Sequence, residues 1–244
     1  MRENKYDDSE FFKQYSLMNR SVNGLEGAGE WHILRSLFPD FENKIVLDLG
    51  CGFGWHAKYA ADHGAKSVVA IDLSENMLKK AIEINSSPKI DYQLCAIEDF
   101  NFKEEAYDIV ISSLSFHYLT SFEEISCQIN KSLVKGGVFI FSVEHPIFTA
   151  QGKQDWSYDT EGKPMHWPLD DYFMEGKRTA NFLGADVVKY HRTLTSYISS
   201  LLNNGFEIKA LVEPTPSELS LLEIPEMKNE LRRPMFLIIS ALKK

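Results

Sequence analysis

Hydrophobic residues gather in short runs that alternate with longer segments of helical period from about Lys44 onwards. The runs are rich in Val, Ile and Phe, and they lie at residues 44–49, 67–71, 90–95, 107–112, 137–143, 206–212 and 234–242. Continuous apolar runs of this length are typical of strands buried on both faces, and the helical segments between them provide the crossovers that parallel strands need. The pattern therefore predicts an α/β fold with a mostly parallel sheet and helices on both faces.

Capping residues mark where the helices between the strands begin. Ser74 precedes an apolar stripe over residues 77–82, and Ser121 with Glu124 three residues later forms a capping box. A last helix is expected over residues 193–203, where apolar residues recur on one side. These signals predict helices directly after the second and fourth strands and a further helix after residue 190.

We expect residues 1–244 to form a single domain in four parts, since one core of this size is near the upper end for a domain. Residues 1–42 are predicted to be a helical N-terminal cap and residues 43–144 a cofactor-binding core. Residues 145–190 interrupt the alternation and are dense in aromatic side chains, which favours an ordered lid or substrate insertion. Residues 191–244 are predicted to supply a C-terminal helix and a pair of strands.

The charge balance bears on possible partners. Asp and Glu outnumber Lys and Arg by 35 to 26, and the net charge of -9 opposes non-specific attraction to nucleic acid or anionic lipid. No apolar run approaches the roughly 20 residues that cross a bilayer, and the N-terminus is charged from its second residue. We therefore expect no nucleic-acid and no membrane partner. No pattern in the sequence indicates a particular oligomeric state.

Cysteines are few and widely spaced. Cys51, Cys95 and Cys127 form no C-x-x-C pair, so neither a disulfide framework nor a thiolate metal site is indicated, and a reducing cytoplasmic location fits best. The histidines show no H-x-x-x-H spacing either, and we expect no bound metal.

A glycine-rich loop follows the first predicted strand. Gly50, Gly52 and Gly54 come directly after that strand and lead into a helix, so the backbone can approach a ligand closely beside free helix N–H groups. This arrangement indicates a nucleotide-like cofactor. The dinucleotide fingerprint places glycines at relative positions 1, 3 and 6, but the sixth position counted from Gly50 is Trp55, which disfavours nicotinamide and flavin cofactors.

Asp72 stands at the end of the second strand, where one carboxylate can accept two hydrogen bonds from a ribose diol. With the D-x-G-x-G-x-G loop at residues 48–54, it makes the chain resemble class I S-adenosylmethionine-dependent methyltransferases over residues 43–143. The chain is similar over nearly its whole length to a bacterial small-molecule subgroup of that superfamily. The motifs that carry this similarity are at residues 24–28, 113–118, 141–146 and 191–193.

The resemblance implies a doubly wound, Rossmann-like sheet of seven strands in the order 3-2-1-4-5-7-6, with the last strand antiparallel and S-adenosyl-L-methionine across the carboxyl ends. Gly50 to Gly52 would meet the methionine part, Asp72 the ribose, and Leu73, Met77 and Ile97 the adenine. The full set of implied cofactor-binding residues is Asp48, Gly50, Cys51, Gly52, Gly54, Asp72, Leu73, Met77, Ala96, Ile97, Glu98, Ser112 and Ser113.

Three residues within this resemblance differ from the patterns of related families. Ala96 stands where an acid usually meets the adenine amino group, so Glu98 or Asp99 must substitute for it or the contact is lost. Ser112 and Ser113 replace the Asn/Asp-Pro-Pro-Tyr signature of enzymes that methylate bases of nucleic acids. Asp48 has two open interpretations, as a cap for turn amides and as a direct cofactor contact.

The acceptor of the methyl group is expected to bind at the carboxyl ends of strands four and five. His117 and His145 follow these strands and are candidates for a catalytic base, and Tyr15, Arg20 and His191 are candidates for substrate binding. Transfer of the methyl group to a small-molecule acceptor by direct in-line displacement is the expected reaction. Two alternatives stay open, a non-catalytic S-adenosylmethionine-binding sensor or scaffold and an NAD-dependent oxidoreductase that tolerates the glycine mismatch.

Overall fold

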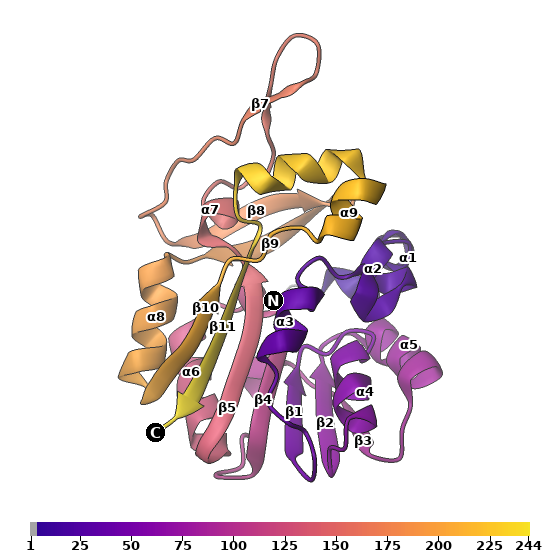
Figure 1. Ribbon diagram of the computed structural model, residues 1–244, viewed down its shortest axis with the longest axis vertical. Helices are drawn as coiled ribbons and strands as arrows, with labels where there is room; N and C mark the ends of the chain where they lie inside the picture. Colours follow the sequence, from indigo (N-terminus) through magenta and orange to yellow (C-terminus); the bar gives the residue numbers. More distant parts are fainter. Residues whose placement is uncertain (1–3) are drawn as a thin grey trace.

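The computed structural model describes residues 4–244, and its centre is a seven-stranded sheet (Figure 1). The strands are β1 (Ile45–Leu49), β2 (Ser67–Asp72), β3 (Ile90–Leu94), β4 (Tyr107–Ser113), β5 (Leu133–Glu144), β10 (Phe206–Val212) and β11 (Phe236–Lys243). They lie in the order β3-β2-β1-β4-β5-β11-β10, and β11 runs antiparallel to both of its neighbours while the other pairs are parallel. The predicted fold class and strand order are confirmed.

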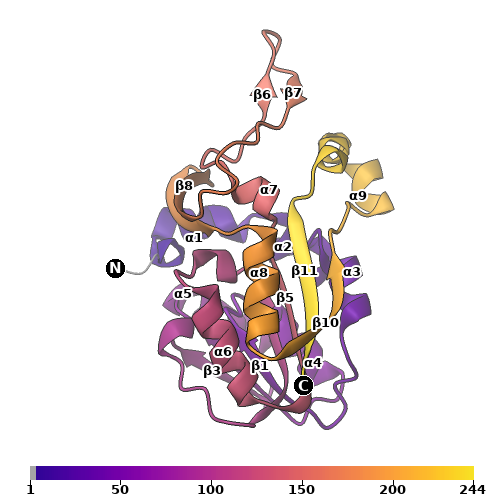
Figure 2. The same ribbon diagram turned by 90° about the vertical axis from the view of Figure 1, so that its left-hand side faces the viewer.

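Helices cover both faces of this sheet (Figures 1 and 2). The helices α3 (Trp31–Leu37) and α4 (Trp55–Asp62), with Leu78 of α5 (Glu75–Asn85), share one hydrophobic cluster with β1 and β2. The helices α6 (Phe122–Ser132) and α8 (Leu194–Asn203) pack on the other face. Helices α5, α6 and α8 begin directly after Ser74, Ser121 and Thr193, whose hydroxyls accept backbone N–H groups as N-caps.

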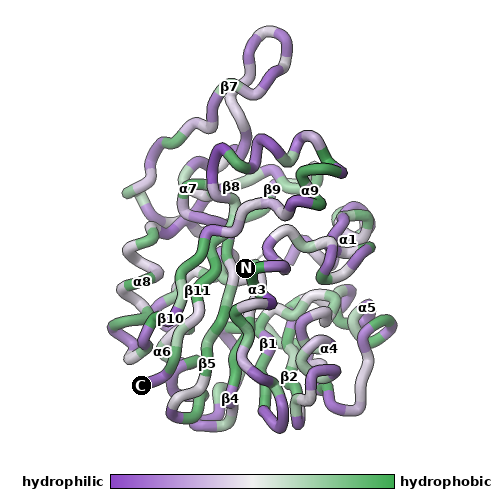
Figure 3. Tube along the Cα trace, viewed as in Figure 1, coloured by the Kyte–Doolittle hydropathy of each residue, from purple (hydrophilic) through white to green (hydrophobic). Residues whose placement is uncertain are grey.

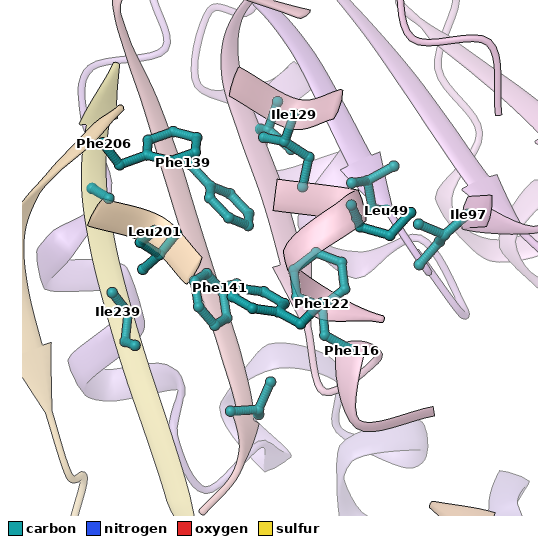
Figure 4. Packing of buried hydrophobic residues seen from close by; sticks show 14 of the residues in the cluster. Leu49, Ile97, Phe116, Phe122, Ile129, Phe139, Phe141, Leu201, Phe206 and Ile239 are labelled. Atoms are coloured by element: carbon teal, nitrogen blue, oxygen red, sulfur yellow. The ribbon is translucent and has the colours of Figure 1, made fainter. Parts of the chain in front are cut away.

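The core on the α6 and α8 face is strongly aromatic (Figure 4). Phe139 and Phe141 of β5 stack with their ring centroids 4.8 Å apart, and Phe116 meets Phe141 at 5.5 Å. Phe122 of α6 and Tyr197 of α8 join the same group at 4.9 Å. Hydrophobic residues accordingly concentrate along the strands of the sheet (Figure 3). Because Phe116 belongs to the turn after β4, this group anchors that turn, which carries part of the site.

Strand β5 begins earlier than its sequence suggests. The expected strand started at residue 137, but β5 starts at Leu133, directly after α6 ends. Gly136 has a φ of +74°, a conformation that glycine adopts without steric cost, and the pairing of β4 with β5 shifts register between Tyr107 and Ile109. The chain therefore turns from helix into strand through a bulge that the apolar pattern alone does not show.

Residues 145–190 form structured elements on top of the sheet. They contain α7 (Pro146–Thr149) and the short hairpin of β6 (Ser157–Tyr158) and β7 (Pro164–His166). The longer hairpin of β8 (Gly176–Phe182) and β9 (Ala185–His191) completes this segment and ends one residue beyond it. The β6–β7 hairpin projects from the body of the molecule (Figures 1 and 2). Between β10 and β11 the chain adds α9 (Glu218–Glu223) and the 3-10 helix η5 (Pro225–Arg232), which the sequence pattern did not predict.

The N-terminal part lies over the same end of the sheet (Figure 1). It consists of η1 (Lys5–Asp7), α1 (Ser9–Ser16), α2 (Asn19–Val22) and η2 (Gly24–Gly27), which precede α3. Asp7 anchors it to the core, because its carboxylate accepts hydrogen bonds from the Ser74 hydroxyl at 2.6 Å and the Asn76 amide at 3.1 Å, at the start of α5. Two further 3-10 helices, η3 (Ile97–Asp99) and η4 (Phe116–Tyr118), follow β3 and β4. Within residues 4–244, no helix is both long enough and apolar enough to cross a bilayer.

Candidate functional site

A cavity of about 590 Å³ lies at the carboxyl ends of β1, β2 and β4. The N-terminal helices and the β8–β9 hairpin contribute its outer walls. The predicted site residues that line it are Tyr15, Arg20, Gly50, Cys51, Gly52, Asp72, Leu73, Met77, Ala96, Ile97, Glu98, Ser113 and His117. The others, Asp48, Gly54, Ser112, His145 and His191, lie outside its lining.

The glycine loop turns sharply at the end of β1. Gly50 and Cys51 both donate their N–H groups to the carbonyl of Ile71 at 2.9 Å, which folds the loop back on β2. Gly50 has a φ of +71°, and a Cβ there would stand 2.6 Å from the Ser115 Cβ. Gly52 also has a positive φ, and a Cβ there would meet nothing. Gly50 is therefore required by packing, whereas Gly52 leaves an open floor that a ligand can approach.

Gly54 has a structural reason of its own. It is the N-cap of α4 with a φ of +74°, and a Cβ there would lie 2.2 Å from the Tyr92 hydroxyl. The residue therefore serves the close approach of α4 to β3, behind the cavity wall. Cys51 does line the cavity, and burial raises the pKa of its thiol well above the ordinary value, so the sulfur is protonated.

Asp72 faces the glycine loop at the end of β2. Its Oδ2 accepts the Gly52 N–H at 2.8 Å and its Oδ1 accepts the Ser74 N–H at 2.9 Å. Burial raises the pKa of the Asp72 carboxyl, although the amide hydrogen bonds oppose that shift. Each carboxylate oxygen can accept a further hydrogen bond from the cavity, so this group is suited to a ligand with two adjacent hydroxyls.

Asp48 lies beneath the glycine loop and is fully buried. Burial, with a smaller contribution from the charge of Asp72, raises the pKa of Asp48 to about 7. The Ala57 amide of α4 opposes this shift, but neither carboxyl oxygen has a hydrogen bond of normal geometry within the described residues. The carboxyl therefore supports the loop from behind in a largely uncharged form at moderately acidic pH.

The turn after β4 is fastened to β1 by two hydroxyls. Ser112 and Ser115 both donate to the Leu49 carbonyl, at 2.8 and 3.2 Å, and their own oxygens are 2.5 Å apart. Ser112 is thus engaged behind the wall, while Ser113 lines the cavity and donates to Glu30 at 3.2 Å. These contacts place the turn that carries His117 against the glycine loop.

An ion pair that the sequence pattern did not reveal lies beside Ser113. Arg20 of α2 donates to Glu30 Oε1 at 2.9 Å, and Glu30 is almost fully buried at the start of α3. Burial alone would raise the pKa of Glu30, but the charge of Arg20, the hydrogen bonds to the carboxylate and the nearby His56 together outweigh burial and lower that pKa. The pair is therefore ionised, and it holds the Arg20 guanidinium at the cavity wall.

His117 lines the same cavity as Asp72 and is only 2% exposed. Burial lowers its pKa to about 4, so the imidazole is neutral at pH 7. Its Nδ1 accepts the backbone N–H of Glu144 at 3.5 Å, and the Glu144 side chain also lines the cavity. Tyr6 and Tyr118 also line the cavity, and their hydroxyl oxygens are 3.0 Å apart. Glu144, Tyr6 and Tyr118 were not among the predicted site residues.

His145 and His191 lie at the base of the insertion. His145 accepts the Ile147 N–H on Nδ1 at 3.0 Å as the N-cap of α7, and its Nε2 is 2.8 Å from Glu213. His191 is bonded on Nδ1 to the Thr149 hydroxyl at 2.8 Å and on Nε2 to the Tyr172 carbonyl at 2.9 Å. Both rings are buried and engaged within the protein, so the structure places them away from the cavity.

Comparison with known proteins identifies the family. A family model described as a methyltransferase domain matches residues 47–141. A crystal structure from Listeria monocytogenes, assigned to the S-adenosylmethionine-dependent methyltransferases, is 55% identical and has a TM-score of 0.86 over 91% of this chain and 99% of that one. The chain belongs to the S-adenosylmethionine-dependent methyltransferases.

Two further relatives match this chain over nearly its full length, and one of them is also assigned to this family. An S-adenosylmethionine-dependent methyltransferase from Mesorhizobium loti is 38% identical to this methyltransferase, with a TM-score of 0.83 over 90% of this chain and all of that one. An uncharacterised protein from Haemophilus influenzae is 31% identical over 98% of this chain and 96% of its own length. The cofactor of this methyltransferase is therefore S-adenosylmethionine.

The cavity fits this cofactor on chemical grounds. Asp72 offers acceptor positions to a ribose, and the open position at Gly52 leaves room beside the loop. Leu73, Met77 and Ile97 contribute apolar lining of the kind that suits a planar base. Within the described part of the chain, no three His, Cys, Asp or Glu side chains come together as a metal site.

We expect Asp48→Asn to change how stability depends on pH. Because the pKa of Asp48 is higher in the folded protein, about 7, than in the unfolded chain, stability should fall as pH rises from about 4 to 7. The slope is at most about 1.4 kcal/mol per pH unit for one group. The variant removes this slope, so urea unfolding across this pH range should show it gaining stability relative to the wild type as pH rises. Asp91→Asn, which changes an exposed carboxylate on β3, is the control, and parallel curves for Asp48→Asn and the wild type would contradict the assignment.

Proposed function

We propose that this methyltransferase transfers the methyl group to a small-molecule acceptor bound in the same cavity, by direct in-line displacement. The observation that supports the proposal is the continuity of the cavity, which runs from the glycine loop and Asp72 to His117 and Glu144 under the β8–β9 hairpin. Its volume of about 590 Å³ is within the usual range for small-molecule sites. A folded polymer would have to enter past the N-terminal helices and the insertion.

The proposed division of the cavity follows its chemistry. Asp72 binds the ribose, the backbone of Gly50 to Gly52 adjoins the methionine part, and Arg20 binds a carboxylate of cofactor or acceptor. The bound cofactor supplies an activated methyl group on a positively charged sulfur, so the chain's own task is alignment and exclusion of water. The buried walls around His117 suit that task.

His117 is proposed to orient the acceptor. Its neutral state and the hydrogen bond from the Glu144 amide to Nδ1 favour the tautomer that carries its proton on Nε2. Such an imidazole donates a hydrogen bond from Nε2 and is a poor base there. With a pKa of about 4 it is also a weaker base than an ordinary histidine. The geometry therefore favours orientation over proton removal.

The cofactor assignment is tested by calorimetry with S-adenosylhomocysteine. Asp72→Ala should weaken binding by roughly 1.5–3 kcal/mol, the range for a hydrogen bond to a charged group. Asp91→Ala is the matched control, because Asp91 is an exposed carboxylate on the neighbouring strand β3. NAD should not bind. An unchanged affinity in Asp72→Ala would remove this carboxylate from the cofactor site.

The size of the acceptor is tested by fluorescence anisotropy with labelled RNA and DNA. At moderate salt we expect no tight binding, because the net charge of -9 repels phosphate backbones. Binding below micromolar concentration that weakens steeply with salt would favour a nucleic-acid acceptor and contradict the proposal.

The role of His117 is tested by two substitutions in the presence of an acceptor found by screening. His117→Ala should slow turnover by about 10-fold or more, the cost of one hydrogen bond in the transition state. His117→Gln can still donate a hydrogen bond and should retain most activity. If His117 instead acts as the catalytic base, both variants should be slower by about 10²–10⁴-fold. Affinity for S-adenosylhomocysteine should change little in either variant. Full turnover by His117→Ala would refute the assignment.

A further inference from the structure

The two faces of strand β9 have different surroundings. Val188 and Tyr190 line the cavity, whereas Val187, Lys189 and His191 point to the other side and are buried. Lys189 is only 2% exposed, and a lysine is seldom buried to this degree without a partner. Its position on the insertion, directly behind a cavity wall, therefore calls for an explanation.

Lys189 is held in a closed polar triangle. Its Nζ donates to Glu144 Oε1 at 2.5 Å and to Gln154 Oε1 at 2.9 Å. Gln154 in turn donates its Nε2 to Glu144 Oε2 at 2.8 Å. Both oxygens of Glu144 are thus bound from the insertion side, while the same side chain borders the cavity.

We propose that Lys189 is a positioning residue for methyl transfer, which fixes the Glu144 carboxylate beside His117 so that the insertion shapes the polar wall of the acceptor site. This inference rests on the proposed function in assigning the acceptor to the His117 end of the cavity. It adds that Glu144 presents an ionised, hydrogen-bond-accepting group there. An acceptor that carries an O–H or N–H group fits this wall.

The link between the triangle and His117 is direct. The Glu144 amide donates to His117 Nδ1, and the negative charge of Glu144 acts on the imidazole. Without Lys189 that charge is buried and unpaired beside His117, and it then draws a proton onto the imidazole. Protonation changes the hydrogen bonds that His117 offers to the cavity.

The backbone of the His117 turn is held by a separate group. Arg192 donates to the Phe116 carbonyl at 3.2 Å and to the Leu119 carbonyl, so it closes η4 from both ends. Removal of the Lys189 charge therefore leaves this turn anchored. A substitution at position 189 reports on the Glu144 carboxylate and not on the fold of the turn.

The titration of His117, followed by NMR in the complex with S-adenosylhomocysteine, tests the proposal. The charged and titratable groups that act on the imidazole are Glu144 from β5, Lys189 from β9, Arg192 directly after β9 and Arg20 from α2. Lys189→Met removes a positive charge and unpairs a negative one, so the pKa of His117 should rise by roughly one pH unit or more. His117→Gln identifies the resonance.

Two further variants make the expectation specific. In the double variant Glu144→Gln with Lys189→Met both charges are absent, and the pKa of His117 should return close to its wild-type value. Lys153→Met, an exposed lysine next to Gln154 in the same insertion, should leave the titration unchanged. If Lys189→Met does not fold, Lys189→Gln carries the same expectation, because its amide can still donate to Glu144 without a charge.

The outcomes separate this inference from the proposed function. An unchanged His117 titration in a folded Lys189→Met or Lys189→Gln protein overturns the positioning role, whatever the acceptor. If the titration shifts but His117→Ala keeps full turnover, the coupling stands and the assigned acceptor end of the proposed function fails. With an acceptor in hand, Lys189→Met should lower kcat by about 10-fold or more while KM for S-adenosylmethionine stays within about twofold.

Discussion

The carbonyl of Leu49, at the end of β1, is the point on which the site depends. Parallel strands leave their last backbone groups without sheet partners where the chain turns away, and here the Ser112 and Ser115 hydroxyls both donate to this carbonyl. On the neighbouring strand β2, the Ile71 carbonyl accepts hydrogen bonds from the backbone N–H groups of Gly50 and Cys51. These bonds satisfy the strand ends and also fix the glycine loop against the turn after β4. The groove between the two loops follows from the need to satisfy buried backbone groups.

Paired charges distinguish the outer walls of the cavity from its floor. Two ion pairs lie in these walls. Arg20 with Glu30 joins α2 to the start of α3, and Lys189 with Glu144 joins β9 to the end of β5. Such pairs contribute little net stability, but they are costly to separate, so they fix which groups face each other. Asp48 beneath the cavity floor and Asp72 in the cavity wall have no cationic partner of this kind within residues 4–244, and burial raises both of their pKa values.

Much of the sheet and of the cavity floor could be predicted from the sequence, because both depend on residues that are close together in the chain. Apolar runs and Ser caps locate strands and helices, and glycines with a terminal Asp72 mark a strand-end site. The β8–β9 hairpin, Glu30 and Lys189 could not be predicted in this way. Their meaning comes from partners far away in the chain, as with Lys189 and Glu144, which are 45 positions apart. A buried lysine in a polar insertion looks like a solvent-exposed residue until its partner is known.

The contrast between His117 and His145 shows that a position just after a strand does not by itself tell whether a residue faces the cavity. Both residues follow strands at the carboxyl edge, which suggests the same exposure to the cavity. However, β5 borders the antiparallel strand β11, and His145 continues this edge by donating its backbone N–H to the Met235 carbonyl at 2.8 Å. Its side chain then caps α7, and the residue before it, Glu144, borders the cavity. Within the described residues, the turn after β4 is extended only once in this way, by the Leu114 N–H that donates to the Ser142 carbonyl of β5 at 2.9 Å, and His117 three residues further on lines the cavity.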